Sequence, residues 1–154
     1  MFFSACRLDR DMLYLAMIDK KLTKHMQRFS DNVCTRMLKN FAINQSKVEY
    51  PEVVVYKGKL LPGEDNDCIG VYDPEKVQIL LTIPEGKVYK EYKKFANSPA
   101  IGNVKSDDPM DRLRALFYHE LAHWMVDYIL KDHTHKHNRA FRVCYAYLRQ
   151  VYTS

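Results

Sequence analysis

The segment His119-Glu120-Leu121-Ala122-His123 has the spacing H-E-x-x-H inside a stretch that reads as a helix. Histidines four residues apart share one helical face, with Cβ atoms about 5–6 Å apart, so both imidazoles can bind one metal ion. Glu120 could then take a proton from a water molecule that the metal activates. The alternative is a polar seam on an amphipathic helix, with both histidines hydrogen-bonded to neighbours. The spacing favours a metal site.

A zinc site of this type needs a third protein ligand, and the position of that ligand separates the known classes of zinc enzymes that share the H-E-x-x-H motif. One class would need glycine at position 126 and histidine at 129, where this chain has Val126 and Ile129. A second class needs a downstream glutamate, and none follows Glu120. The residues alone leave three candidates, at alternate positions of the following segment: His133, His135 and His137.

The segment His137-Asn138-Arg139-Ala140-Phe141 completes a pattern that resembles the SprT-like (Spartan-like) zinc metallopeptidases. Their hallmark is H-E-x-x-H followed, about a dozen residues later, by H-G-x-x-F. The resemblance implies that Phe141 packs under the site. The other two loop histidines are expected to be solvated, with the alternative that either replaces His137 as ligand. Asn138 replaces the usual glycine, and asparagine also tolerates the left-handed geometry expected for a turn into the last helix. One zinc ion would therefore have three ligands: His119, His123 and His137.

The resemblance further implies a zinc-dependent endopeptidase that hydrolyses peptide bonds in protein substrates, with DNA-associated proteins as one substrate class and Glu120 as general base. An oxyanion partner is expected, and the sequence leaves Tyr118, Tyr145 and Tyr147 open. The alternatives are a non-catalytic protein on a zincin scaffold, a nucleic-acid-binding module, and a repressor-cleaving regulatory peptidase. The last class usually supplies a glutamate ligand beyond the motif, which is missing here.

The predicted fold class is α+β, with a zincin-like order of N-terminal helices, a small three-stranded, mainly antiparallel sheet, the motif helix and a C-terminal helix. Asp108 can cap the motif helix and Pro109 suits its first position. Strands are expected at 53–56, 68–72 and 77–83, the last two joined as a hairpin. Residues 77–83 are predicted to form the edge beside the site, where an extended peptide could add as another strand. The alternative for this strand is an interior position.

Two helices are predicted in the N-terminal part. Apolar residues recur at helical spacing from residue 8 to 29, the segment Ser30-Asp31-Asn32 should break the helix, and a shorter helix should follow over 33–41.

Length and composition predict a single domain, because 154 residues with 47% hydrophobic content can bury one good core. Its parts are a helical region at 1–45, a sheet at 50–84 and the metal-site helices at 108–152. No apolar run approaches the roughly 18 residues that span a membrane, and no signal-like segment is seen. We therefore expect a cytoplasmic protein, or a nuclear one in a eukaryote, that is not secreted. The four cysteines are scattered and are expected to be reduced core thiols.

A net charge of +5 is moderate, and the positions of the cations are more informative. Lysines alternate with aromatic residues near position 90, a pattern that suits a nucleic-acid backbone and its bases. The alternative is a short helix with core aromatics and solvated lysines. The predicted partners are a protein or peptide substrate and DNA, with the oligomeric state open. The residues that would contact DNA are Lys87, Lys90, Lys93, Lys94, Arg139 and Arg142.

Overall fold

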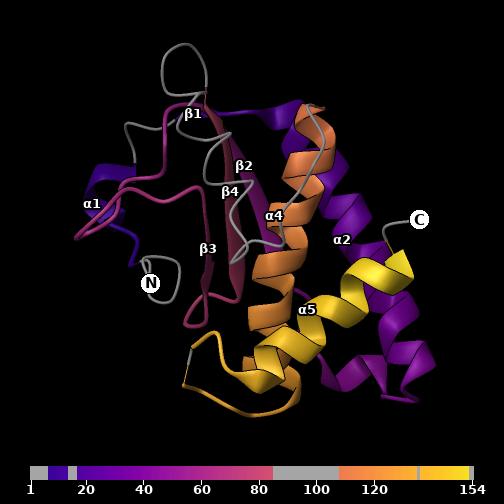
Figure 1. Cartoon of the computed structure of the whole chain (residues 1–154). Coiled ribbons are helices and arrows are strands. Elements are labelled where there is room, and N and C mark those ends of the chain that lie inside the picture. Colours follow the sequence, from indigo (N-terminus) through magenta and orange to yellow (C-terminus); the bar gives the residue numbers. More distant parts are fainter. Residues whose placement is uncertain (1–6, 14–16, 85–107, 135, 153–154) are drawn as a thin grey trace.

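The protein is a mixed α+β domain, as the computed structural model in Figure 1 shows. The structure describes residues 7–13, 17–84, 108–134 and 136–152. In chain order the elements are α1 (Arg10–Leu13), β1 (Met17–Ile18), α2 (Lys20–Asn40), η1 (Gln45–Lys47), β2 (Glu52–Gly58), β3 (Gly70–Asp73), β4 (Gln78–Pro84), α4 (Pro109–Trp124), η2 (Met125–Ile129) and α5 (Arg139–Tyr152).

The strands of the described part form one sheet in the order β1-β2-β4-β3. β1 pairs antiparallel with β2, and β3 pairs antiparallel with β4. The central pair, β2 and β4, is parallel over seven residues, from Glu52 opposite Gln78 to Gly58 opposite Pro84. The edges of this sheet are therefore β1 and β3.

Successive side chains along each strand point to opposite faces of the sheet, and both faces are covered. Residues such as Val55 and Leu81 pack into the main core with α2, α4 and α5, whereas Leu80 and Tyr56 pack with Leu61 on the other face. Figure 1 shows α4 lying against the sheet, and α5 crosses the C-terminal end of α4. In β3 the same alternation turns Tyr72 toward the helices and Val71 away from them. The edge strand β3 thus presents alternate residues to the motif helix.

The expected three strands are present, but two details of the predicted sheet are wrong. A fourth strand, β1, extends the sheet. The longest strand pairing of the sheet, between β2 and β4, is parallel and not antiparallel. The segment predicted as the edge, 77–83, corresponds to β4, which lies between β2 and β3. The predicted hairpin is confirmed, and Asp73 accepts hydrogen bonds from the N–H groups of Glu75 and Lys76 in its turn. Because a hairpin fixes only the β3–β4 pairing, the partner on the far side of β4 could not be read locally.

The N-terminal helices also differ from prediction. A short α1 and strand β1 precede one continuous helix, α2, whose N-cap Asp19 accepts a hydrogen bond from the Leu22 N–H. The polar segment at 30–32 does not break α2. Ser30 is buried within it, and Asp31 accepts a hydrogen bond from Gln27, one turn earlier. Contacts along the helix thus override the intrinsic preference of these residues for caps and turns.

The motif helix begins as predicted. Asp108 is its N-cap and accepts a hydrogen bond from the Met110 N–H, and Pro109 occupies the first helical position. Its inner face is buried against the sheet through residues such as Leu113 and Leu116. Among the described residues, no helix has the length and apolar character required to cross a membrane.

The cysteines only partly follow the prediction of reduced core thiols. Cys34 and Cys144 are free and buried, whereas Cys68 is disulfide-bonded. Burial raises the pKa of the Cys34 thiol to about 12, so it is protonated and unreactive at neutral pH.

Candidate metal centre

The two histidines of the motif lie at the C-terminal end of α4. His119 is 3% exposed and His123 is half-buried, and their rings are 5.1 Å apart between centroids. The helix then continues as a π-helical turn, η2, in which the Leu130 N–H donates to the Met125 carbonyl oxygen. Such turns often occur next to functional sites. Here it directs the chain from α4 into the loop that leads to His137.

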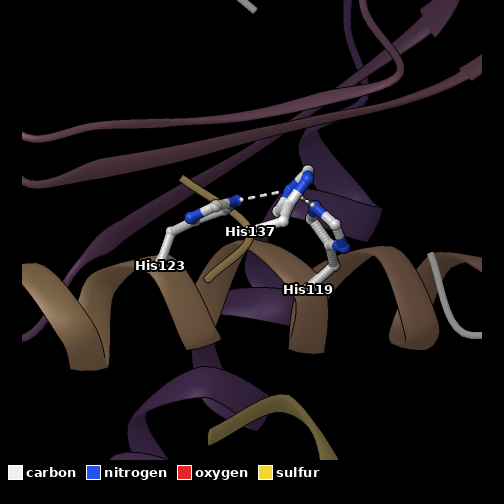
Figure 2. Close-up of side chains that lie close together, drawn as sticks. All are labelled: His119, His123 and His137. Carbon is white, nitrogen blue, oxygen red and sulfur yellow. Dashed lines mark hydrogen bonds between the residues drawn. The ribbon is translucent and has the colours of Figure 1, made fainter. Parts of the chain in front are cut away.

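Figure 2 shows the side chains of His119, His123 and His137 converging on one point, two from α4 and one from the loop just before α5. The Nε2 atom of His137 is 3.2 Å from that of His123 and 3.1 Å from that of His119. Nitrogen ligands on a tetrahedral zinc ion are about 3.3 Å apart, as follows from Zn–N bonds of about 2.0–2.1 Å. The two distances from His137 therefore fit a shared metal ion, and the ligand atoms of all three histidines lie within 4.8 Å of one another.

Hydrogen bonding among the rings explains the cluster less well than a cation does. One Nε2 atom either carries a proton or offers one in-plane lone pair. His137 Nε2 approaches two other Nε2 atoms at once, so it cannot make two strong, linear hydrogen bonds. Burial lowers the pKa of His137, which favours the neutral imidazole that metals require. The three histidines thus form a group that could hold one metal ion.

Phe141 packs against all three rings of this group, as the resemblance implied. Its ring centroid lies 4.8 Å from His119, 4.4 Å from His123 and 4.6 Å from His137. Phe141 is 2% exposed, so it seals the group from the side of α5. It also limits the rotamers available to each imidazole.

Asn138 has a different role from the one expected. It is absent from the residues with positive φ, so the chain enters α5 without a left-handed turn at this position. Instead its side-chain oxygen accepts a hydrogen bond from the Phe141 N–H, which is N-capping geometry. Its amide also donates to Asp132 in the preceding loop. Asn138 thus connects the start of α5 to the loop that carries His137.

Glu120 lies between the motif helix and the edge strand β3. It is 7% exposed, and a Cβ added to Gly70 would lie 3.2 Å from its Oε2 atom. Burial raises the pKa of Glu120 to about 8, and a hydrogen bond from the Tyr72 backbone N–H partly opposes this shift. A carboxyl group with a pKa near neutrality suits proton transfer.

Of the other loop histidines, His133 is not part of the group. Its Nδ1 atom forms a 2.6 Å hydrogen bond with Asp127, and its side chain is 67% exposed. His135 lies outside the described residues.

The three tyrosines considered as oxyanion partners lie in different surroundings. Tyr118 packs against Phe29 of α2, and Tyr147 packs against Phe41. Tyr145 is in ring contact with His119 at 5.6 Å. Burial raises its pKa to about 12. Tyr145 therefore lies against the histidine group.

Sequence reasoning missed three residues of this region: Gly70, Tyr72 and Asp127. Gly70 and Tyr72 were expected only as strand residues. Asp127 lies four residues after His123 and seven after Glu120, a helical spacing that could have marked it as a neighbour of the site. The packing of β3 against the motif helix has no comparable signal in the local sequence.

The predicted DNA contacts are only partly within the described residues. Arg139 and Arg142 are exposed and three residues apart on α5. The four lysines of the prediction, Lys87, Lys90, Lys93 and Lys94, lie outside the described residues. DNA binding therefore stays a prediction.

Fold and site together define a mixed α+β protein with a three-histidine group able to hold a metal ion. Comparison of the chain with protein-family models, with curated proteins and with solved structures found no match.

Proposed function

We propose that the protein is a zinc-dependent endopeptidase. The observation that carries this proposal is the approach of His137 Nε2 to 3.1–3.2 Å from the Nε2 atoms of His119 and His123. The buried Glu120 directly follows His119 in the chain. Three nitrogen ligands with a position left for water or substrate are the donor set of catalytic zinc sites. Structural zinc sites instead have four protein ligands, and among the described residues no fourth ligand joins this group.

The proposed chemistry assigns a separate task to each part. A zinc ion, when bound, supplies a Lewis acid that activates water and polarises a peptide carbonyl. Glu120 accepts the proton of the attacking water and delivers it to the leaving amine. Contacts with β3 would hold this buried carboxyl group in place for that transfer. Tyr145 is our candidate for stabilising the developing oxyanion.

The edge strand β3 offers a position for the substrate backbone. It lies at one edge of the described sheet and contacts α4 directly. An extended peptide that adds to such an edge forms main-chain hydrogen bonds with little dependence on sequence. We therefore propose an unfolded or flexible protein segment as the substrate, bound along β3 instead of along residues 77–83.

Zinc content and protease activity of matched variants test this function. Purified wild-type protein should contain one zinc ion per chain, and His137→Ala should lose it. Glu120→Gln should keep the zinc and cut a flexible protein substrate at least about a hundredfold more slowly. His25→Ala, an exposed position on α2, is the control and should match the wild type in both measurements.

The alternative is a metal-binding module that does not cut. Full zinc occupancy without any protease activity in the wild type would support that module. Hydrolysis by Glu120→Gln at the wild-type rate would refute the proposed mechanism.

A further inference from the structure

A buried carboxylate, Asp127, bridges two elements that border the histidine group. Its Oδ2 atom accepts a 2.9 Å hydrogen bond from the Tyr72 hydroxyl, and its Oδ1 atom is 2.6 Å from His133 Nδ1. Asp127 and Tyr72 are each 7% exposed. Burial and the bond to Asp127 both raise the pKa of Tyr72, so its hydroxyl remains a donor.

The three residues come from three different parts of the fold. Tyr72 belongs to the edge strand β3, Asp127 to the π-helical turn η2, and His133 to the loop between η2 and α5. That loop ends at His137, the most distant of the three candidate ligands in sequence. Asp127 therefore connects the strand, the motif helix and the ligand-bearing loop through one side chain.

Further contacts hold the same loop to η2 and α5. The Asp132 N–H donates to the Val126 carbonyl oxygen, and the side chain of Asp132 accepts from the Asn138 amide. The His133 bond is the loop's side-chain connection to the buried carboxylate. A loop held in this way has lost much of its conformational freedom before a metal binds, which lowers the entropic cost of metal binding.

Tyr72 also connects Asp127 with the acid of the motif. Its backbone N–H donates to Glu120 and its hydroxyl to Asp127. The two carboxyl groups are seven residues apart, and one residue of the edge strand binds both. A displacement of β3 would therefore disturb the position of Glu120 as well.

We propose that Asp127 is a positioning residue for the zinc site and for the peptide-binding strand. Through His133 it fixes the loop that carries His137, and through Tyr72 it fixes the edge strand β3. This inference rests on the proposed peptidase function. We call the Asp127–His133 hydrogen bond the loop arm and the Asp127–Tyr72 hydrogen bond the strand arm. Their effects are separable, because the loop arm acts on a metal ligand and the strand arm acts on the strand proposed to bind the substrate.

Single substitutions can remove each arm while leaving Asp127 in place. His133→Ala removes the loop arm at an exposed side chain, and Tyr72→Phe removes one hydroxyl while keeping the backbone N–H. Tyr128→Phe is the matched control for the tyrosine, because its hydroxyl accepts from the Glu49 N–H at the same end of α4. His25→Ala is the control for the histidine.

The measurements are zinc affinity by chelator competition, the visible spectrum of the cobalt(II)-substituted protein, and KM and kcat on a flexible protein substrate. His133→Ala should lower zinc affinity about tenfold, as loss of outer contacts to a metal site does, and should change the cobalt spectrum. Tyr72→Phe should raise KM about threefold to tenfold, the equivalent of one hydrogen bond, with zinc affinity within about twofold. Both controls should match the wild type.

Wild-type zinc affinity and cobalt spectrum in His133→Ala, or a wild-type KM in Tyr72→Phe, would overturn the positioning role. The positioning role would also be overturned if the zinc-free variants lost as much free energy of unfolding, measured by thermal unfolding, as they lost free energy of zinc binding. The effect would then be general destabilisation. Failure of the proposed function gives a different result: the wild type itself would lack zinc or protease activity.

Discussion

The backbone N–H of Tyr72 donates a hydrogen bond to the carboxyl group of Glu120. This bond places the acid of the H-E-x-x-H motif directly against the edge strand β3. The contact is possible because residue 70 of the same strand is glycine, where a Cβ would lie 3.2 Å from Glu120 Oε2. The position of the proposed general base therefore depends on two residues of the strand as well as on its own helix.

Gly70→Ala should slow hydrolysis with little loss of stability. The added methyl group would push the Glu120 carboxyl group by a few tenths of an ångström and would also contact Leu81, 3.3 Å away. The glycine has no positive φ, so alanine meets no backbone strain. We expect kcat to fall about tenfold, since small displacements of catalytic groups are costly. Steady-state kinetics and thermal unfolding measure the two effects, and an unchanged kcat would contradict the proposed position of Glu120.

Phe141→Leu should weaken metal binding more than its effect on folding suggests. The ring contacts all three histidines, and leucine fills the space without fixing their orientation. We expect a loss of about 1.5 kcal/mol in the free energy of unfolding of the zinc-free protein and about tenfold in zinc affinity. Val143→Ala, at a position 60% exposed on the same helix, should leave both quantities unchanged. Equal zinc affinity in Phe141→Leu and wild type would count against a role for the ring.

The local parts of this fold were predictable because their signals are local. Asp108 and Pro109 marked the start of the motif helix, the polar turn after Asp73 marked a hairpin, and the spacing of His119 and His123 marked a shared helical face. The proximity of His137 came from the resemblance to a known motif. Periodicity alone left three histidines open.

The unpredicted parts depend on contacts between distant segments. The parallel pairing of β2 with β4 buries β4 in the sheet and makes β3 the edge beside the site. The bond from Tyr72 to Asp127 joins residues 55 positions apart. The continuity of α2 through Ser30 likewise reflects burial of this residue in the core, which no helix-breaking preference reveals.

Cys34 should make the stability of the fold sensitive to alkaline pH. Burial raises the pKa of this thiol from about 9 when unfolded to about 12 when folded. The folded state therefore favours the protonated thiol, so the stability contributed is complete below pH 9 and is lost as pH rises toward 12. The free energy of unfolding should fall by up to about 1.4 kcal/mol per pH unit in this window relative to Cys34→Ala. Denaturant titrations between pH 7 and 10.5 test this, and parallel curves for the two proteins would contradict it.

Asn138 should matter as a helix cap and not as a substitute for glycine in a left-handed turn. Its side chain accepts from the Phe141 N–H and donates to Asp132. Asn138→Ala should therefore cost about 1 kcal/mol of unfolding free energy, and Asn138→Gly only a few tenths from the cap itself. Urea unfolding of the zinc-free proteins measures both values. If glycine increased the stability above that of the wild type, a left-handed turn would be the better description of this position. If alanine cost nothing, the cap would not contribute to stability, and the position of His137 would have to depend on the loop contacts to Asp127 and Val126.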